Sequence, residues 1–379
     1  MKKIYTDCRI INDGKVICGK DIVAENGYIR QIAPAGSVTD GDIISLGGNY
    51  ISAGFIDIHC HGGNGFEFVD GTEDAAIGAC EIHYRHGTRV IYPTVSASDR
   101  NVTYKALEAV EKAKNKCLTV IPGVHLEGPY LAPAMCGGQN ISTLRRPDED
   151  EYSGLYERFG SLISRWTYAP EEDIDFKFTE FLRDNGITAS AGHTAAVYDD
   201  IKGAFERGCG LITHLYSCTS TVTRSGGFRK LGVIESAFLI KEMYVEAIAD
   251  GKHLPYELLK MIVDIKGTDR VCLITDALRP GGYGKEYEGK VFDNCAVPFI
   301  IEDGVAKLPD RSAFAGSIAT MDILLKTAVE AGIPLPECVR MITETPARVM
   351  GLKEYGRIEA GCKAVFTVFD EGLNIIDFE

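Results

Sequence analysis

Gly-Phe-Ile-Asp-Ile-His-Cys-His-Gly-Gly, residues 54–63, is the stretch that decides the fold we expect. Its apolar residues predict a short strand that ends in two histidines one residue apart. Side chains alternate between the faces of a strand, so His59 and His61 are expected on one side and Cys60 on the other. Asp57 is expected on the histidine side, where it can hydrogen-bond one of the rings. Two imidazoles at a strand end supply half of a metal site.

Beyond this strand, short β runs alternate with helical stretches, which is the pattern of βα units in a parallel sheet. Seven more strands are expected, at Arg89–Thr94, Val120–Leu126, Trp166–Ala169, Thr188–Gly192, Leu211–Leu215, Tyr244–Ala249 and Val271–Thr275. The helices between them include Tyr104–Lys114, Val197–Arg207 and Tyr256–Lys266. Eight such strands predict an α/β fold, a (β/α)8 TIM-like barrel over residues 53–352. Residues 283–308 are expected to form an inserted hairpin.

The two ends of the chain have a different pattern, in which turn signals separate short alternating runs. Asn12-Asp13-Gly14 and Glu25-Asn26-Gly27 are such signals near the start, and Ala364–Phe369 resumes the β pattern near the end. We therefore expect residues 1–52 and 353–379 to pair into one small β-sandwich domain, with the barrel as the catalytic domain between them.

Composition excludes several classes of protein. The chain has 379 residues, 45% of them hydrophobic and 25% charged, as in ordinary soluble globular proteins. A net charge of −14 without a basic cluster disfavours nucleic-acid binding. The first residues lack the apolar segment of a signal peptide, and no apolar run reaches transmembrane length. The twelve cysteines form no Cys-x-x-Cys pair, so we expect reduced thiols in a cytoplasmic protein with no membrane partner.

In a (β/α)8 barrel the chemistry lies at the C-terminal ends of the strands. Six of the eight histidines fall at predicted strand ends, which scattered core histidines would not do. They are His59, His61, His125, His193, His214 and His253. Glu127 and Asp276 end or follow two of the same strands. The sequence therefore predicts a catalytic site at this rim of the barrel.

The residue types at the rim indicate metal chemistry. Glu127, His193 and His214 are three ligands, the number that a catalytic divalent metal takes while one position stays open for water. His59 and His61 can hold a second ion, with Glu127 as a candidate bridge. We favour Glu127 as a ligand over a loop cap, because a glutamate at the end of an apolar barrel strand caps poorly.

Two further rim residues suit the hydrolysis of an amide. A metal ion lowers the pKa of bound water to about 7, which makes a nucleophile available at neutral pH. Asp276 is the natural carboxylate to take the proton of that water and return it to a leaving amine. His253 can polarise a substrate carbonyl and stabilise the developing oxyanion.

Other polar residues near the rim have simpler explanations. His125 is expected to be structural, and Asp250 to cap the turn before His253. Glu171 is equally compatible with a loop cap and with a ligand on the fourth strand. His83 and His86, in the expected helix 75–86, are assigned to packing or to the surface.

The order of the motifs resembles the amidohydrolase superfamily, and within it the N-acetylglucosamine-6-phosphate deacetylase family. The matching segments are residues 55–62, His-Leu-Glu-Gly-Pro at 125–129, Ala-Pro-Glu at 169–171, Gly-His-Thr at 192–194, Thr-His-Leu-Tyr at 213–216, Ala-Asp-Gly-Lys-His at 249–253 and Ile-Thr-Asp-Ala at 274–277. The resemblance implies removal of acetate from an acetamido sugar phosphate with one or two divalent ions, zinc first and iron or another ion as alternatives. It also implies a homodimer in which the neighbouring subunit helps to close the sugar-phosphate site.

The chain departs from this family where the sugar binds. The family usually continues Asn-Ala-Met after His-Leu-Tyr, whereas Ser217-Cys218-Thr219 stands here. The phosphate-binding arginine of the family has two candidate counterparts, one of them in the apparent insertion 220–228. The expected substrate contacts are Gln139, Asn140, Ser217, Cys218, Arg224, Arg229 and Ala315. Two alternatives stay open: an amidohydrolase of another N-acyl or cyclic amide substrate, and a binding protein without activity.

Overall fold

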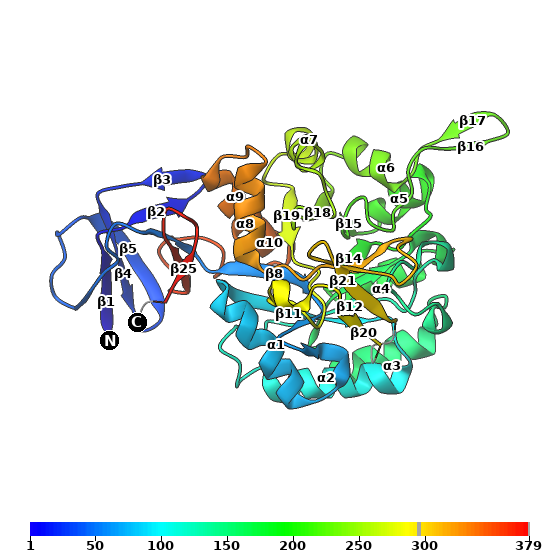
Figure 1. Cartoon of the computed structure of the whole chain (residues 1–379), viewed down its shortest axis with the longest axis horizontal. Helices are drawn as coiled ribbons and strands as arrows, with labels where there is room; N and C mark the ends of the chain where they lie inside the picture. The colour runs from blue at the N-terminus through cyan, green and yellow to red at the C-terminus, as the bar shows by residue number, and fades with distance from the viewer. Residues whose placement is uncertain (294–296, 378–379) are drawn as a thin grey trace.

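The computed structural model describes residues 1–293 and 297–377, and an eight-stranded parallel barrel forms its centre (Figure 1). The strands, in the order in which they pair, are β8 (Phe55–Cys60), β11 (Thr88–Ser96), β12 (Val124–Glu127), β13 (Ile163–Tyr168), β14 (Thr188–Ala191), β15 (Cys209–Ile212), β18 (Tyr244–Ile248) and β19 (Val271–Ile274). The ends of β19 and β8 close the barrel, because Asp276 N donates to His59 O at 2.9 Å and His61 N donates to Ala277 O at 2.9 Å. The predicted TIM-like barrel is confirmed.

Helices surround the barrel and bury their apolar faces on its strands (Figure 1). They are α1 (Glu73–Arg85), α2 (Arg100–Ala113), α3 (Glu149–Phe159), α4 (Lys177–Asp184), α5 (Tyr198–Glu206), α6 (Val233–Leu239), α7 (Tyr256–Lys266), α8 (Met321–Glu330), α9 (Leu335–Met341) and α10 (Glu344–Val349). In α2 the buried residues Thr103, Ala106, Leu107 and Val110 follow helical spacing and so form one face. None of the helices in the described ranges is both long and apolar enough to cross a membrane.

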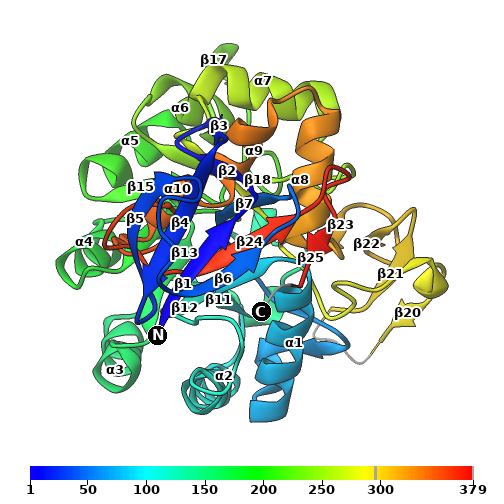
Figure 2. The same ribbon diagram turned by 90° about the vertical axis from the view of Figure 1, so that its left-hand side faces the viewer.

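The two chain ends build a second unit beside the barrel, which faces the viewer in Figure 2. One of its sheets contains β5 (Tyr28–Pro34), β4 (Lys20–Glu25), β1 (Lys2–Thr6) and β6 (Asp42–Ser45). The other contains β25 (Ile375–Ile376), β24 (Phe366–Phe369), β7 (Tyr50–Ala53), β2 (Arg9–Asn12) and β3 (Lys15–Ile17). Strand β24 runs antiparallel to β7, and Ile10, Ile51 and Val368 share a buried core. The small β-sandwich from both ends is therefore confirmed, while its boundaries at residues 52 and 353 stay predictions.

Three smaller β segments in the described residues lie outside these units, and the shortest pairs β9 (Gly62–Gly63) with β10 (Phe66–Glu67). A four-stranded antiparallel sheet contains β20 (Val291–Phe292), β21 (Phe299–Glu302), β22 (Val305–Lys307) and β23 (Phe314–Gly316). The expected hairpin at 283–308 corresponds to β21 and β22, which two flanking strands extend; its residues 294–296 lie outside the described residues. A second hairpin, β16 (Thr223–Ser225) with β17 (Phe228–Lys230), projects from the molecule (Figure 1).

Candidate active site

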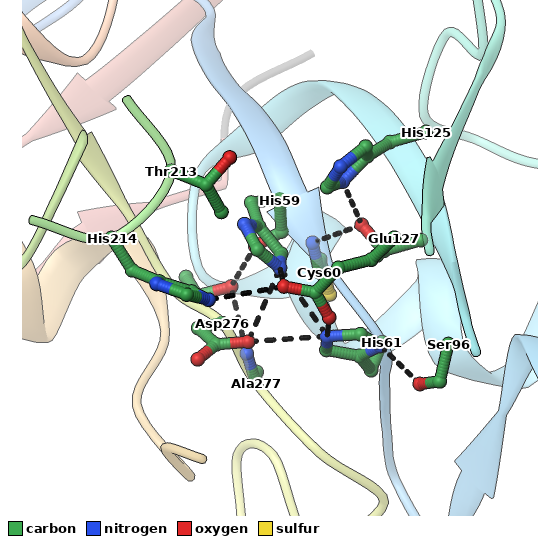
Figure 3. A network of polar contacts seen from close by, with 12 residues as sticks. His59, Cys60, His61, Ser96, His125, Glu127, Thr213, His214, Asp276 and Ala277 are labelled. Atoms are coloured by element: carbon green, nitrogen blue, oxygen red, sulfur yellow. Dashed lines mark hydrogen bonds and ion pairs between the residues drawn. The ribbon is translucent and has the colours of Figure 1, made fainter. Parts of the chain in front are cut away.

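Four histidines and two carboxylates from five strand ends converge at the C-terminal mouth of the barrel (Figure 3 labels all but His193). His59 and His61 belong to the end of β8, Glu127 ends β12, and the others follow β14, β15 and β19: His193, His214 and Asp276. Their side-chain nitrogen and oxygen atoms lie 3.0–3.4 Å from one another in the closest pairs. The structure thus brings together all the predicted metal ligands and Asp276.

Glu127, His193 and His214 form the first cluster. Glu127 Oε1 lies 3.2 Å from His193 Nε2 and 3.0 Å from His214 Nε2, and the two nitrogens are 3.1 Å apart. Tetrahedral Zn²⁺ with bonds of 2.0–2.1 Å holds its ligand atoms about 3.3 Å apart. The three atoms therefore have the mutual spacing that a small divalent ion imposes.

His59, His61 and Asp276 form the second cluster, beside the first. Asp276 Oδ1 lies 3.4 Å from His59 Nε2 and 3.2 Å from His61 Nε2, and the two nitrogens are 3.3 Å apart. Glu127 reaches this cluster as well, with Oε1 3.4 Å from His59 and Oε2 3.2 Å from His61. The carboxylate of Glu127 thus connects the two clusters, as a bridging ligand does.

The hydrogen bonds behind the rings test whether these residues fit a cation. Nδ1 of His193 faces Met135 O at 2.9 Å, and Nδ1 of His214 faces Ser217 O at 3.1 Å. A carbonyl oxygen only accepts, so each Nδ1 carries a proton, and each ring in its neutral, metal-binding form presents the Nε2 lone pair to the centre. Two lone pairs 3.1 Å apart repel each other unless a positive charge lies between them. The donor set therefore fits a divalent metal.

The charges around the site also favour a cation. Burial opposes a charge on the His59 ring, yet Glu127, Glu246 and Asp276 together raise the pKa of His59 to about 10. The site is thus built for positive charge at its centre, which a divalent ion supplies.

Three of the site residues have a left-handed backbone, which is costly for side chains other than glycine. The φ angles are 48° at His193, 29° at His214 and 48° at Asp276. Such conformations cost about 1–3 kcal/mol each and persist where the surroundings hold them. Each lies two residues beyond the end of a barrel strand, so the strained turn aims the side chain into the mouth.

A pocket of about 260 Å³ opens above the clusters. It is lined by His61, Ser96, Glu127, Gly138, Gln139, His193, His214, Tyr216, Ser217, Cys218, His253, Asp276, Leu278, Ala313, Phe314, Ala315 and Gly316. Of the expected substrate contacts, Gln139, Ser217, Cys218 and Ala315 therefore lie at the pocket. Asn140 lies at a smaller adjacent cavity of about 50 Å³.

The remaining expected contacts, Arg224 and Arg229, lie elsewhere. They pair across the exposed hairpin β16–β17, which projects from the molecule (Figure 1), and neither lines the pocket. No arginine or lysine lines the 260 Å³ pocket in the described part of the chain. Within one copy of the chain, neither arginine is therefore brought to the site.

His253 lies at the pocket with its ring held from behind. Its Nδ1 lies 2.7 Å from Asp250 Oδ2, and its ring meets Phe314 edge-on at 4.8 Å between centroids. Asp250 Oδ1 accepts from the backbone N–H groups of Lys252 at 2.9 Å and His253 at 2.8 Å. Asp250 is thus a turn cap, as predicted, and it also orients the His253 ring, which sequence reasoning missed.

Gln139 has a second contact that the sequence did not indicate. Its Nε2 donates to Glu127 Oε2 at 2.5 Å, and its Oε1 accepts from Ala97 N at 2.9 Å. Gln139 therefore holds the bridging carboxylate in place while it lines the pocket.

The structure decides between the simpler explanations of other polar residues. His125 is buried with its ring between Thr94 Oγ1 at 3.1 Å and Thr167 Oγ1 at 2.7 Å, so it is structural, as predicted. Glu171 accepts from the hydroxyl of Thr194 and from the backbone N–H of Ala195, at 2.5 Å each, which supports the loop-cap alternative.

The expected contact of Asp57 with a histidine ring was wrong. Its carboxylate accepts from Thr275 Oγ1 at 2.5 Å and from the backbone N of His59 at 3.2 Å. The pairing of β8 with β11 shifts register twice, so side chains do not alternate regularly along this strand.

Two functional candidates, Glu246 and Arg165, gave no sequence signal that we recognised. They form a fully buried ion pair inside the barrel, directly below His59. One charged residue within each apolar strand, Tyr244–Ile248 and Ile163–Tyr168, is the feature that could have indicated them.

The chain is similar to known proteins over nearly its whole length. The family model described as "Amidohydrolase family" matches residues 50–378. The N-acetylglucosamine-6-phosphate deacetylase of Haemophilus influenzae is 31% identical over 378 residues, which cover 98% of this chain and 95% of the relative. An N-acetylgalactosamine-6-phosphate deacetylase of Shewanella is 28% identical over 369 residues, with 97% and 88% covered.

Solved structures agree with the sequence relatives. The crystal structure of N-acetylglucosamine-6-phosphate deacetylase from Pasteurella multocida superposes with a TM-score of 0.91 at 28% identity, covering 100% of this chain and 98% of that one. A mutant of the Mycobacterium smegmatis enzyme in complex with N-acetyl-D-glucosamine-6-phosphate gives 0.89 at 26% identity, covering 100% and 97%.

Proposed function

Because the chain belongs to the amidohydrolase family, we propose that it is a metal-dependent deacetylase of N-acetylglucosamine 6-phosphate or a close acetamido sugar phosphate. The reaction hydrolyses the acetamido group and gives acetate and the amino sugar phosphate. The observation that carries the proposal is the convergence of four histidines, Glu127 and Asp276 at one mouth, with ligand atoms 3.0–3.4 Å apart.

We assign Glu127, His193 and His214 to the first cation, and His59 and His61 to a second, with Glu127 shared. A divalent cation bound there lowers the pKa of a water ligand and polarises an amide carbonyl. Zinc suits these nitrogen and oxygen donors, and iron or another divalent ion is accepted by the same set.

The chain's own residues supply the proton transfers. Asp276 lines the pocket beside the histidines, so it can take a proton from the attacking water and return it to the leaving amine. His253, held by Asp250 through Nδ1, faces the same pocket, and when its Nε2 also carries a proton it donates to the carbonyl oxygen and stabilises negative charge there.

The phosphate of the substrate requires a cationic partner that one copy of the chain does not place at the pocket. Arginine suits phosphate through two parallel hydrogen bonds. We assign this role to Arg224 or Arg229, delivered by the projecting hairpin of a neighbouring copy in a homodimer. The exposed Phe228 at the tip of this hairpin supports contact with another surface.

A cytoplasmic location is part of the proposal. The eleven cysteines in the described ranges are all free thiols, which suits a reducing compartment. A phosphorylated sugar is also a substrate expected inside a cell.

Acetate release tests the proposal. Protein stripped of metal is compared with protein reloaded with Zn²⁺ or Fe²⁺, on N-acetylglucosamine 6-phosphate, its galactosamine isomer, unphosphorylated N-acetylglucosamine and an N-acetyl amino acid. We expect metal-dependent release from a sugar phosphate and far less from the other two compounds. Release that is equal with and without metal, or confined to the amino acid, contradicts the proposal. The isomer is included because Ser217-Cys218 changes the sugar-facing segment.

A further inference from the structure

A buried ion pair, Arg165 with Glu246, lies inside the barrel below the metal clusters. Both side chains are fully buried, in a space that branched apolar residues fill in most (β/α)8 barrels. A buried pair is costly to desolvate and is often no more stable than apolar residues of the same volume. Stability alone therefore gives a poor account of this pair.

The arginine fixes the glutamate from below. Besides Glu246 Oε1, the Arg165 guanidinium donates to three oxygens: Ser190 Oγ at 3.1 Å, Ile58 O at 3.0 Å and Thr213 Oγ1 at 2.9 Å. These contacts come from β14, β8 and the end of β15, so the guanidinium has little freedom. Glu246 Oε1 is occupied by Arg165, and Oε2 is left for the residues above.

Glu246 Oε2 connects the two metal clusters. It lies 3.1 Å from the backbone N of His214 and 3.1 Å from His59 Nδ1. The ionised carboxylate only accepts, so Nδ1 of His59 must carry a proton. A metal-binding histidine is a neutral ring, and with the proton on Nδ1 the lone pair of His59 is on Nε2, which faces the second cluster, where Glu127 and Asp276 lie at 3.4 Å.

His59 is the one ligand histidine whose Nδ1 faces a carboxylate. The Nδ1 atoms of the other three face neutral groups, namely Ser96 Oγ, Met135 O and Ser217 O. A carboxylate behind a ligand histidine fixes its tautomer and strengthens its bond to the metal. His59 is also the least exposed of the four ligand rings: it is fully buried and absent from the pocket lining.

Glu246 has a further effect through charge. It neutralises Arg165, whose guanidinium binds the carbonyl of Ile58, the residue before His59. Without Glu246, a positive charge would remain beneath the second cluster and oppose a cation there.

We propose that Glu246, held by Arg165, is a positioning residue that makes His59 a cation ligand and thereby creates the second cation position. The inference rests on the proposed metal-dependent function only for the presence of a first cation. The buried pair of Arg165 and Glu246 thus determines whether the site holds one cation or two.

The test counts ions in the full chain. Metal-free wild type and Glu246→Gln are titrated with Co²⁺, followed by visible absorption and by metal analysis after desalting. We expect two ions per chain in wild type. In Glu246→Gln we expect the affinity of the second to fall about 10–100-fold, with the first unchanged. Ser96→Ala, which removes the neutral group behind His61, is the matched control and should weaken the second ion less.

A second variant keeps the inference testable if Glu246→Gln does not fold. Glu246→Leu combined with Arg165→Met leaves no unpaired buried charge and should fold, with the second ion still weakened. The inference is overturned if either folded variant binds two ions at wild-type affinity, or if the wild type binds only one ion. Neither result contradicts the proposed function. A wild type that binds no divalent ion overturns the proposed function as well.

Discussion

Asp276 and Glu127 have different tasks although both are carboxylates in one site. Glu127 contacts all four ligand histidines and is held by Gln139, so it is fixed between the clusters. Asp276 touches only the second cluster and lines the pocket. The geometry thus separates a bridging ligand from a group that can exchange protons with a substrate.

For Asp276→Asn we expect kcat to fall by about 10²–10⁴-fold, because the amide cannot carry the proton from water to the amine. The ligands of the first cation are untouched, so that ion should remain bound. Acetate release at saturating substrate and metal analysis of the same sample measure both effects. A variant that keeps the full kcat would exclude Asp276 as the acid and base.

Single residues also show where sequence reasoning works. The ligands could be predicted because each ends an apolar strand, and strand ends meet at one rim in this fold. Glu246 could not, since one charge within an apolar strand does not tell whether it faces the barrel interior or a helix. Asp57 was placed wrongly because strict alternation was assumed for β8, where the pairing is irregular.

The hairpin β16–β17 is the element least connected to the rest of its chain. All six of its strand residues are exposed. The sequence predicted an insertion at 220–228 but not its β structure, because a hairpin without apolar alternation has no periodic signal. Its arginines can contribute to a site only by reaching another copy.

We expect replacement of residues 223–230 by a short Gly-Ser link to leave the melting temperature unchanged. KM for the sugar phosphate should rise at least tenfold, because the phosphate loses its guanidinium. Arg224→Ala and Arg229→Ala separate the two candidates, and an N-acetyl sugar without phosphate is the matched control substrate. If KM for the sugar phosphate is unchanged, the hairpin does not bind phosphate.

Helix α1 is tied to the end of β8 by His83. The buried ring donates from Nε2 to Gly62 O at 2.8 Å, and burial lowers the pKa of His83 to about 4. The unfolded chain binds this proton near pH 6.5, so between pH 6.5 and 4 the unfolded state holds more protons than the folded state. The stabilisation from a neutral His83 is therefore complete above pH 6.5 and is lost as pH falls towards 4.

In the wild type, His83 alone should lower the free energy of unfolding by at most about 3 kcal/mol between pH 6.5 and pH 4. Urea unfolding at pH 7.0 and pH 4.5 measures it, with His83→Gln as the comparison because glutamine does not titrate. The difference in unfolding free energy between the two pH values should be smaller in the variant. Equal differences would show that His83 has no part in the acid sensitivity.

At the level of the whole molecule, Phe369 joins the two units. It belongs to β24 of the sandwich, yet its buried ring packs against Phe55 at 5.9 Å and Tyr50 at 5.5 Å between centroids. Thr367 Oγ1 adds a bond to Gly87 O at 2.7 Å. The sequence predicted that the chain ends pair, but not these contacts, because long-range packing depends on three-dimensional placement that local patterns do not contain.

Phe369→Ala should reduce the free energy of unfolding by about 3–5 kcal/mol, since it removes a large ring from a packed core. Phe228→Ala is the matched control: that ring is 78% exposed and its loss should have almost no effect on stability. Thermal or urea unfolding of the two variants provides the comparison. Similar losses in both would contradict the role of Phe369 in joining the units.

The pairing of β24 with β7 has a consequence during protein synthesis. β7 ends at Ala53 and its partner begins at Phe366, so the ribosome must make the entire barrel before this sheet can be completed. At ordinary elongation rates the wait is roughly 15–60 s. Throughout it, one edge of β7 lacks its partner strand, and an unpaired edge is a template for aggregation. A product released before its last residues keeps that edge open permanently, which makes it a substrate for chaperones and proteases.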